Sequence, residues 1–317
     1  MTHFPLLPIA VLLVACSGET TPDTKDEPDD PPSPYIVPEG EPPAPTSTLE
    51  EVGAALQEAL DLAFTVNADP VHASYDKAME GASGDCPYVY TTPDGSYWYD
   101  NCVSDAGAEF DGYVFSLAAD DVYDPTYGFT YSFWYAFGGA TVVDADGHTL
   151  EVGGGAVTQK VSDEVNGVNL SEYYSLLEGT FDWDGAEAEG TWLETAIDPD
   201  LELYAYAAPD FGASYVQLSG GFGGLLDGWA VAFDTNGVGS ELLEFACELE
   251  LSGTVGVRAP DGTWTDVRFD GVVDPYALDE FDPALCDGCG EAWFQGELLG
   301  EVCVDVSTLL AAGVQPW

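Results

Sequence analysis

Basic side chains are almost missing from this sequence. Five lysine and arginine residues stand against 58 aspartate and glutamate residues, so the formal net charge is -53. A surface of this sign repels nucleic acids and anionic lipid headgroups, which argues against either as a partner bound through charge. We therefore expect a solvated acidic surface, with a dedicated cation-binding role as the less favoured alternative. The basic residues are Lys25, Lys77, Lys160, Arg258 and Arg268.

Histidine is scarce, and the motifs of common catalytic sites are absent. The chain has three histidines, His3, His72 and His148, and no HExxH, GxSxG or P-loop pattern. Zinc-dependent and serine-based hydrolysis are therefore not expected. Carboxylate-based glycan hydrolysis is compatible with so many acids, but no pair is singled out. Without a DxDxDG loop, we expect no cofactor other than weakly bound Ca²⁺ at the acidic turns 120–128 and 196–202.

The chain opens with a short apolar run, Pro5 to Ala15, in MTHFPLLPIAVLLVAC. The run is too short to span a membrane and predicts a signal peptide over residues 1–15. Its end, LVAC at residues 13–16, resembles the lipobox of bacterial lipoproteins. The resemblance implies cleavage before Cys16, lipidation of its sulfur and anchoring to a membrane. Ser17 resembles the outer-membrane sorting signal of that family, which implies a cell-envelope protein facing the periplasm or the surface. An ordinary signal peptide is the alternative.

Two further segments follow from the composition. Residues 16–45 are dominated by proline and acidic side chains, which predicts a disordered tether between the membrane anchor and the folded domain. Residues 46–317 are predicted to form a β domain with one N-terminal helix, 48–66, packed on the sheet. Ser47 or Thr48 can cap this helix, and a shorter helical piece is predicted over 69–80. The apolar stripe of the helix predicted over 48–66 comprises Leu49, Val52, Leu56, Leu60 and Phe64.

From Cys86 onward, alternating residues and turn signals predict successive antiparallel strands. A three-residue turn at Pro93-Asp94-Gly95 would place Tyr90 opposite Trp98 and Cys86 opposite Cys102. Similar turns are predicted within 144–152 and 259–267. A two-residue turn at Asp184-Gly185 would place Gly179 opposite Gly190, with Phe181 and Trp183 facing Ala188 and Ala186.

Glycine recurs within the predicted strands, always on the apolar face. The pattern of apolar, polar, glycine, any residue and apolar begins at Phe110, Leu177, Ala188, Leu218, Leu251, Phe269 and Phe294. Glycine on an inner face removes a side chain where a sheet bends sharply. We therefore predict an all-β fold, a curved antiparallel meander closed as a barrel or paired as a β-sandwich.

Six cysteines remain after Cys16, an even number that suits disulfides in an exported chain. The hairpin register predicts a Cys86–Cys102 disulfide. For the other four we favour Cys247–Cys303 with Cys286–Cys289, although three pairings are open. Metal binding or redox chemistry at the Cys286–Cys289 pair is the less favoured alternative.

The densest aromatic run, YGFTYSFWYAFGG, begins at Tyr127. We favour a core strand whose inner face carries the rings. The alternative is a platform that stacks sugar rings, using Tyr131, Trp134, Tyr97 and Tyr99. The leading functional hypothesis is a non-enzymatic structural or binding module of the envelope, with a glycan or an envelope protein as partner. A ligand-binding barrel and a carboxylate-based glycan hydrolase are the alternatives.

Overall fold

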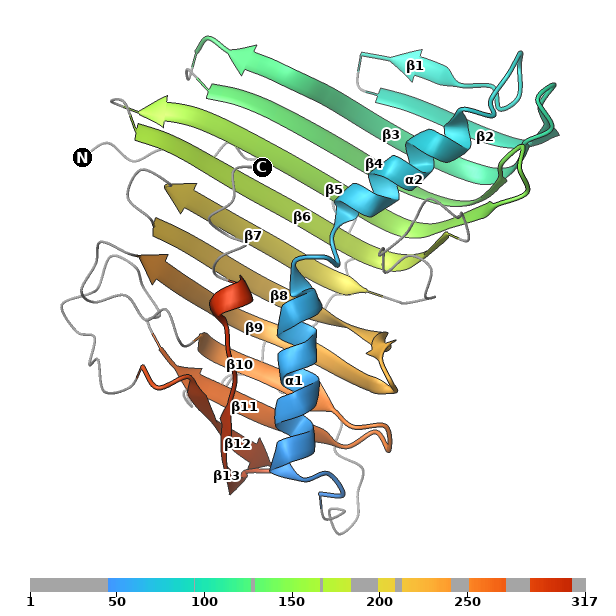
Figure 1. Cartoon of the computed structure of the whole chain (residues 1–317). Coiled ribbons are helices and arrows are strands. Elements are labelled where there is room, and N and C mark those ends of the chain that lie inside the picture. The colour runs from blue at the N-terminus through green and yellow to red at the C-terminus, as the bar shows by residue number, and fades with distance from the viewer. Residues whose placement is uncertain are drawn as a thin grey trace, which may run out of the picture. The chain divides into compact units, whose positions relative to one another are not determined.

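The computed structural model describes residues 45–93, 95–126, 129–165, 168–183, 199–208, 213–240, 251–271 and 286–309. In this part of the chain the strands form one sheet, in sequence order from β1 to β13, and each is antiparallel to the next (Figure 1). The strands are β1 Tyr90–Thr92, β2 Gly95–Val103, β3 Glu109–Asp124, β4 Phe129–Val143, β5 Thr149–Val165, β6 Val168–Trp183, β7 Asp200–Ala208, β8 Ala213–Leu226, β9 Trp229–Ser240, β10 Ser252–Arg258, β11 Trp264–Asp270, β12 Cys289–Phe294 and β13 Glu297–Cys303.

The predicted antiparallel meander is therefore confirmed, and the strand direction turns progressively across it (Figure 1). The sheet is open, since β1 and β13 are its two edges rather than partners. A barrel would need those edges to pair, and a sandwich would need a second sheet. Neither is present among the described residues, where helices cover one face instead.

Two helices, α1 Leu49–Ala63 and α2 Ala68–Met79, lie on the same face of the sheet (Figure 1). Thr48 caps α1, and its side chain and that of Glu51 exchange the hydrogen bonds of a capping box. The predicted helix 48–66 is too long, because α1 ends at Ala63 and the next helix already begins at Ala68. Asn67 then caps α2 by accepting a hydrogen bond from the Asp69 N–H. We call the face under the helices the inner face and the opposite one the outer face.

The inner face carries the core, as strand alternation requires. Trp98 is 2% exposed and Trp134 is 3% exposed beneath α2. The Trp98 Nε1–H donates to the Tyr75 hydroxyl at 3.1 Å, and the His72 ring stacks on Trp134 with centroids 4.5 Å apart. Further along, α1 covers Val255, Val302 and their neighbours on the later strands. Both helices thus serve as the second layer of the domain.

Glycines line up across the inner face, as predicted for the patterns that begin at Phe110, Leu177, Leu218 and Leu251. The prediction was wrong for the pattern at Phe294, because Gly296 lies in the turn between β12 and β13 with a φ of 84°. Gly138 pairs with Gly154, and Gly154 pairs with Gly179 on the next strand. A Cβ atom on Gly154 would overlap the carbonyl oxygen of Glu178, and Gly179 has a φ of 115°. Only glycine fits such a close approach of neighbouring backbones. The predicted Asp184-Gly185 turn, with Gly190 opposite Gly179, lies outside the described residues.

The turns predicted within 144–152 and 259–267 are hairpins of one design. In the first hairpin, the Asp144 N–H donates to the His148 carbonyl, and the Gly147 N–H donates to the Asp144 carbonyl. In the second, the Ala259 N–H donates to the Thr263 carbonyl, and the Gly262 N–H donates to the Ala259 carbonyl. The register predicted around Pro93 was wrong by one residue, because Thr92 pairs with Gly95 and Tyr90 with Tyr97. The shift leaves Trp98 on the inner face under Tyr75 and keeps Tyr90 on the outer face.

The disulfides agree with the sequence in one pair and differ in another. Cys86 and Cys102 are bonded, as the hairpin predicted. The favoured pairing of Cys303 with Cys247 was wrong, because Cys303 pairs with Cys289 across β12 and β13. Cys286 is therefore not bonded to Cys289, although it is in a disulfide. Cys247 lies outside the described residues.

Candidate functional site

The residues predicted to stack a ligand divide between the two faces of the sheet. Tyr97 is 45% exposed and Tyr99 is 82% exposed on the outer face. Tyr131 is half-buried on the same face. Trp134 belongs to the inner face, where His72 and Tyr75 cover it, so it was wrongly grouped with the stacking residues. Strand alternation separates it from Tyr131, which is an odd number of residues away.

The favoured interpretation of the aromatic run as an inward-facing core strand was also wrong. The rings of Tyr131, Phe133, Tyr135 and Phe137 lie on the outer face, and Phe137 is 46% exposed. Tyr97 and Tyr99, both named in the sequence analysis, extend this surface on β2. The contributions of Tyr90, Tyr113 and Phe115 were not predicted. The signal was present in the strand register, which aligns the residues on one side. We define the aromatic face as Tyr90, Tyr97, Tyr99, Tyr113, Phe115, Tyr131, Phe133, Tyr135 and Phe137.

The rings of the aromatic face contact one another in pairs across and along the strands. Tyr90 and Tyr97 have centroids 5.0 Å apart, and Tyr113 meets Phe137 at 6.4 Å. Tyr131 and Phe133 lie nearly parallel at 6.0 Å. Burial, followed by the charge of Glu178, raises the pKa of Tyr135, so its hydroxyl stays protonated. The result is a surface of aromatic rings and tyrosine hydroxyl groups.

A polar groove of about 540 Å³ lies further along the sheet, over β8 to β11. Asp234, Asp270 and Arg268 are its charged residues, and all three are exposed. The Arg268 guanidinium lies 5.1 Å from the centroid of the Trp293 ring, whose Nε1–H donates to Glu291. The uncharged polar side chains of the groove are Gln217, Asn236, Ser252 and Thr254, whereas strand alternation directs the side chain of Thr235 to the inner face. These side chains can hydrogen-bond a ligand but form no recognisable catalytic set.

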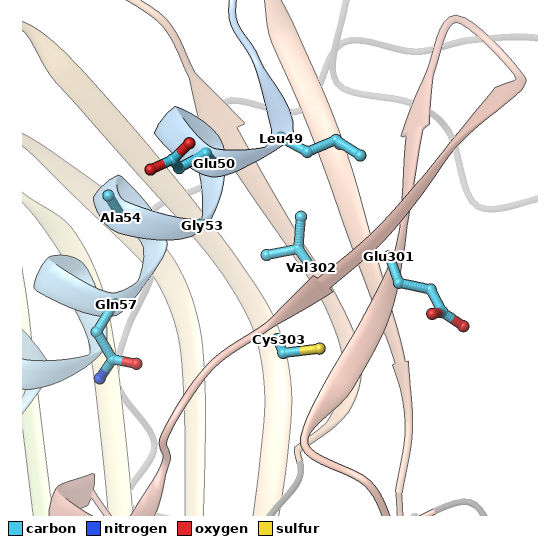
Figure 2. A pocket seen from close by; sticks show the side chains of 8 residues that line it. All are labelled: Leu49, Glu50, Gly53, Ala54, Gln57, Glu301, Val302 and Cys303. Atoms are coloured by element: carbon cyan, nitrogen blue, oxygen red, sulfur yellow. The ribbon is translucent and has the colours of Figure 1, made fainter.

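A second hollow, about 440 Å³, lies along the seam between α1 and β13. Figure 2 shows Leu49, Gly53 and Gln57 of the helix beside Val302 and Cys303 of the strand. Beyond it, the Gln57 amide donates to the Asp305 carbonyl at 2.9 Å and accepts from the Asp305 N–H at 2.7 Å. The seam therefore fastens the helix to the last strand, which is a structural role.

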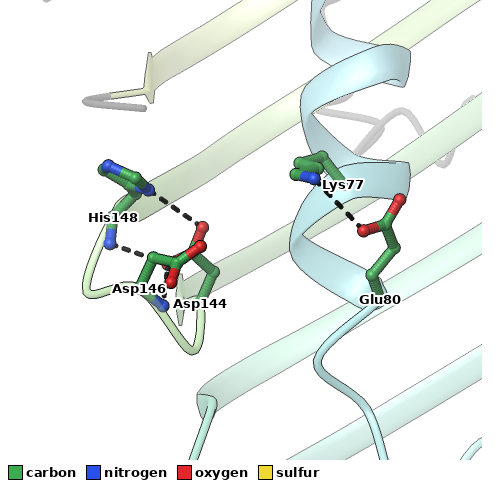
Figure 3. A network of polar contacts seen from close by, with 5 residues as sticks. All are labelled: Lys77, Glu80, Asp144, Asp146 and His148. Atoms are coloured by element: carbon green, nitrogen blue, oxygen red, sulfur yellow. Dashed lines mark hydrogen bonds and ion pairs between the residues drawn. The ribbon is translucent and has the colours of Figure 1, made fainter. Parts of the chain in front are cut away.

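The hairpin between β4 and β5 brings together three side chains able to hold a metal ion. Ligand atoms of Asp144, Asp146 and His148 lie within 4.8 Å of one another (Figure 3). The Asp144 carboxylate already accepts hydrogen bonds from the backbone N–H groups of Asp146 and His148, and it contacts the His148 ring at 3.1 Å. Burial alone would raise the pKa of Asp144, but the bonds from His148 and Asp146 lower it overall. The carboxylate thus completes the turn, and a cation would have to displace these bonds.

A third polar cluster joins the start of α2 to the inner face. Lys160 lies 3.0 Å from Asp69, which also accepts a bond from the Tyr173 hydroxyl at 3.4 Å. The Ser175 hydroxyl accepts the Ala68 N–H at 2.8 Å. Burial and the neighbouring Asp69 raise the pKa of Tyr173. Since these groups satisfy the first turn of the helix, the cluster orients α2 on the sheet.

The remaining predictions concern lipidation at Cys16 and the two acidic turns at which weak Ca²⁺ binding was predicted. Cys16 lies outside the described residues, as do residues 196–198 of the turn predicted at 196–202, whose last three residues belong to β7. In the other turn, the Asp121 N–H bonds to the Ser132 hydroxyl and Asp124 accepts from the Thr126 N–H. Within the described residues no helix has the length and apolar character to cross a bilayer. Comparison with protein-family models, curated proteins and solved structures finds no match to this chain.

Proposed function

We propose that this protein is an exported, lipid-anchored binding module of the cell envelope, whose aromatic face stacks on the sugar rings of a neutral glycan. The observation that supports this function is the exposure of Tyr99, Tyr90, Tyr97, Tyr113 and Phe137 on a face that no described helix covers. Contiguous exposed apolar side chains on a soluble domain mark a binding surface more often than not.

Tyrosine suits this role because its ring and hydroxyl serve opposite needs. The ring offers a broad apolar face to the C–H groups of a sugar, and the hydroxyl stays hydrated or donates a hydrogen bond. Few rotatable bonds limit the entropy lost on binding. The net charge of -53 selects against polyanionic glycans, which leaves neutral chains.

The test measures binding of the full-length protein to neutral polysaccharides, by affinity electrophoresis in gels that contain cellulose derivatives, starch or soluble chitin. We expect retardation in at least one gel, and loss of most of it for the pair Tyr97→Ala and Tyr99→Ala. Both residues are well exposed, so the pair should keep its fold. Tyr123→Ala is the control, since Tyr123 is 61% exposed but outside the aromatic face. Equal migration of wild type and pair in every gel would reject the proposal.

The anchor rests on the lipobox resemblance at residues 13–16. We expect the native protein to fractionate with membranes and Cys16→Ser to appear in the soluble fraction. Mass spectrometry of the mature N-terminal peptide would identify the acyl groups on Cys16. A Cys16→Ser protein that still sediments with membranes would contradict a lipid anchor.

A glycan hydrolase is the second candidate, because the polar groove contains Asp234 and Asp270. A general acid in such an enzyme is normally shielded from water. Both groove carboxylates are exposed, which favours binding over catalysis. We retain weak Ca²⁺ binding as a proposal for the acidic turns and for the hairpin at Asp144.

A further inference from the structure

The polar groove contains an acceptor that no group among the described residues satisfies. The Asn236 Oδ1 atom is buried and has no hydrogen-bond partner in the described structure. Leaving such an atom unpaired destabilises the folded protein, because the desolvation of the atom is not compensated by a hydrogen bond. Asn236 lies on the outer face, paired with Gln217 on one side and Ser252 on the other, and it lines the groove. A ligand hydroxyl is a natural donor for it.

Other groups of the groove surround this acceptor with mixed hydrogen-bonding capacity. Asp234 and Asp270 accept, whereas Arg268 only donates. Contact with the Trp293 ring holds the guanidinium in place, so this donor is pre-organised. With two carboxylates and one guanidinium, the charged groups leave the groove weakly negative. A ligand with phosphate or carboxylate groups is disfavoured, and one with several neutral hydroxyl groups is favoured.

We propose that this groove binds one residue of a neutral sugar chain, as a polar subsite separate from the aromatic face. The inference deepens the proposed function and rests on it in one respect, the choice of a glycan as ligand. Both sites lie on the outer face, the aromatic face over β1 to β4 and the groove over β8 to β11. A single extended chain that follows the sheet across its strands can contact both. The groove supplies hydrogen bonds, and the aromatic face supplies stacking.

The decisive variant is Asn236→Leu, which removes the unpaired acceptor while keeping a side chain of similar size. We expect its melting temperature to match or exceed that of the wild type, because an unsatisfied buried atom is lost. Its affinity for the glycan should fall about tenfold, the equivalent of one lost hydrogen bond of about 1.4 kcal/mol. Asp234→Asn, at an exposed position, should weaken binding in the same direction.

Thr235→Val provides a matched control in the adjacent position. The Thr235 Oγ1 atom is also buried without a partner, but strand alternation directs this side chain to the inner face. The substitution should therefore stabilise the protein in the same way and leave glycan affinity unchanged. Equal effects of both substitutions on affinity would show that Asn236 acts through the fold and would overturn the inference.

Isothermal titration calorimetry of the full-length protein in detergent, with cellohexaose, maltohexaose and chitohexaose, supplies the measurement. Weaker binding by Asn236→Leu and Asp234→Asn, with Thr235→Val unaffected, would support the subsite. If the Tyr97 and Tyr99 substitutions weaken binding but the groove variants do not, the aromatic face stands and the groove inference fails. If the groove variants alone weaken binding, the groove stands and the stacking proposal fails. Absence of binding by all three oligosaccharides overturns both.

Discussion

At the scale of single residues, the glycines of the inner face show how a side chain can be excluded by its neighbours. Gly154 and Gly179 lie opposite each other, and their backbones approach so closely that no Cβ fits. Periodicity alone predicts this face, because alternation assigns each residue to one side. It could not find the pairing of Gly138, Gly154 and Gly179, which depends on the register of three strands.

Gly179→Ala should therefore destabilise the domain. Its φ of 115° is unfavourable for alanine, which alone costs about 1–3 kcal/mol, and overlap with the Gly153 carbonyl adds to this. Gly155→Ala is the control, because an added Cβ there lies 3.7 Å from Phe137, an ordinary contact. Urea denaturation followed by tryptophan fluorescence compares the two. A Gly179→Ala protein as stable as Gly155→Ala would contradict this account of the glycines.

Single aromatic residues show what alternation along a strand cannot predict. Trp134 and Tyr131 belong to one dense run, yet one is buried under α2 and the other lies on the outer face. Alternation separated them correctly, but it could not say which side the helices would cover. That choice depends on His72 and Tyr75, which pack on Trp134 from a distant part of the chain.

At the scale of elements, local signals were the most reliable. The capping box at Thr48, the second helix and the hairpins at 144–148 and 259–263 all depend on neighbouring residues, and all are present. The turn after Thr92 misled the register by one residue, since Thr92 pairs with Gly95 and Tyr90 therefore lies opposite Tyr97. Disulfide pairing among the later cysteines was out of reach, because it depends on which strands become neighbours.

The β4–β5 hairpin gives a prediction with a defined pH dependence. Asp144→Ala removes the acceptor of two backbone N–H groups and the partner of the His148 ring, so unfolding free energy should fall by about 1–3 kcal/mol at neutral pH. The folded-state pKa of Asp144 is lowered, so its stabilisation is present above the ordinary aspartate pKa. It is lost as the pH falls through the folded value.

The measurement is chemical denaturation of wild type and Asp144→Ala over a series of pH values from neutral to acidic. The difference in unfolding free energy should shrink toward zero at the acidic end. Asp146→Ala is the control, because it leaves the Asp144 carboxylate and its donors in place. A constant difference at all pH values would mean that the charge of Asp144 is irrelevant to the turn.

At the scale of the whole molecule, charge is the dominant property. Self-repulsion among 58 acidic side chains opposes the folded state, and only five basic residues offset it. Sodium chloride should therefore raise the melting temperature, because the screening length falls from about 10 Å at 0.1 M to about 3 Å at 1 M. An unchanged melting temperature would contradict this. At matched ionic strength, a larger rise with calcium chloride would reveal the proposed weak Ca²⁺ binding.

The order of the strands has a consequence for how the chain folds. Every described strand pairs with its neighbours in sequence, so hairpins can form one after another as the chain is synthesised. Helix α1 is the exception, since it packs on β13 and β8 to β10, although it precedes them all. The apolar stripe of α1 therefore stays exposed until β13 has been synthesised. The core is therefore complete only after β13 has formed. A chaperone that shields α1 would prevent aggregation during that interval.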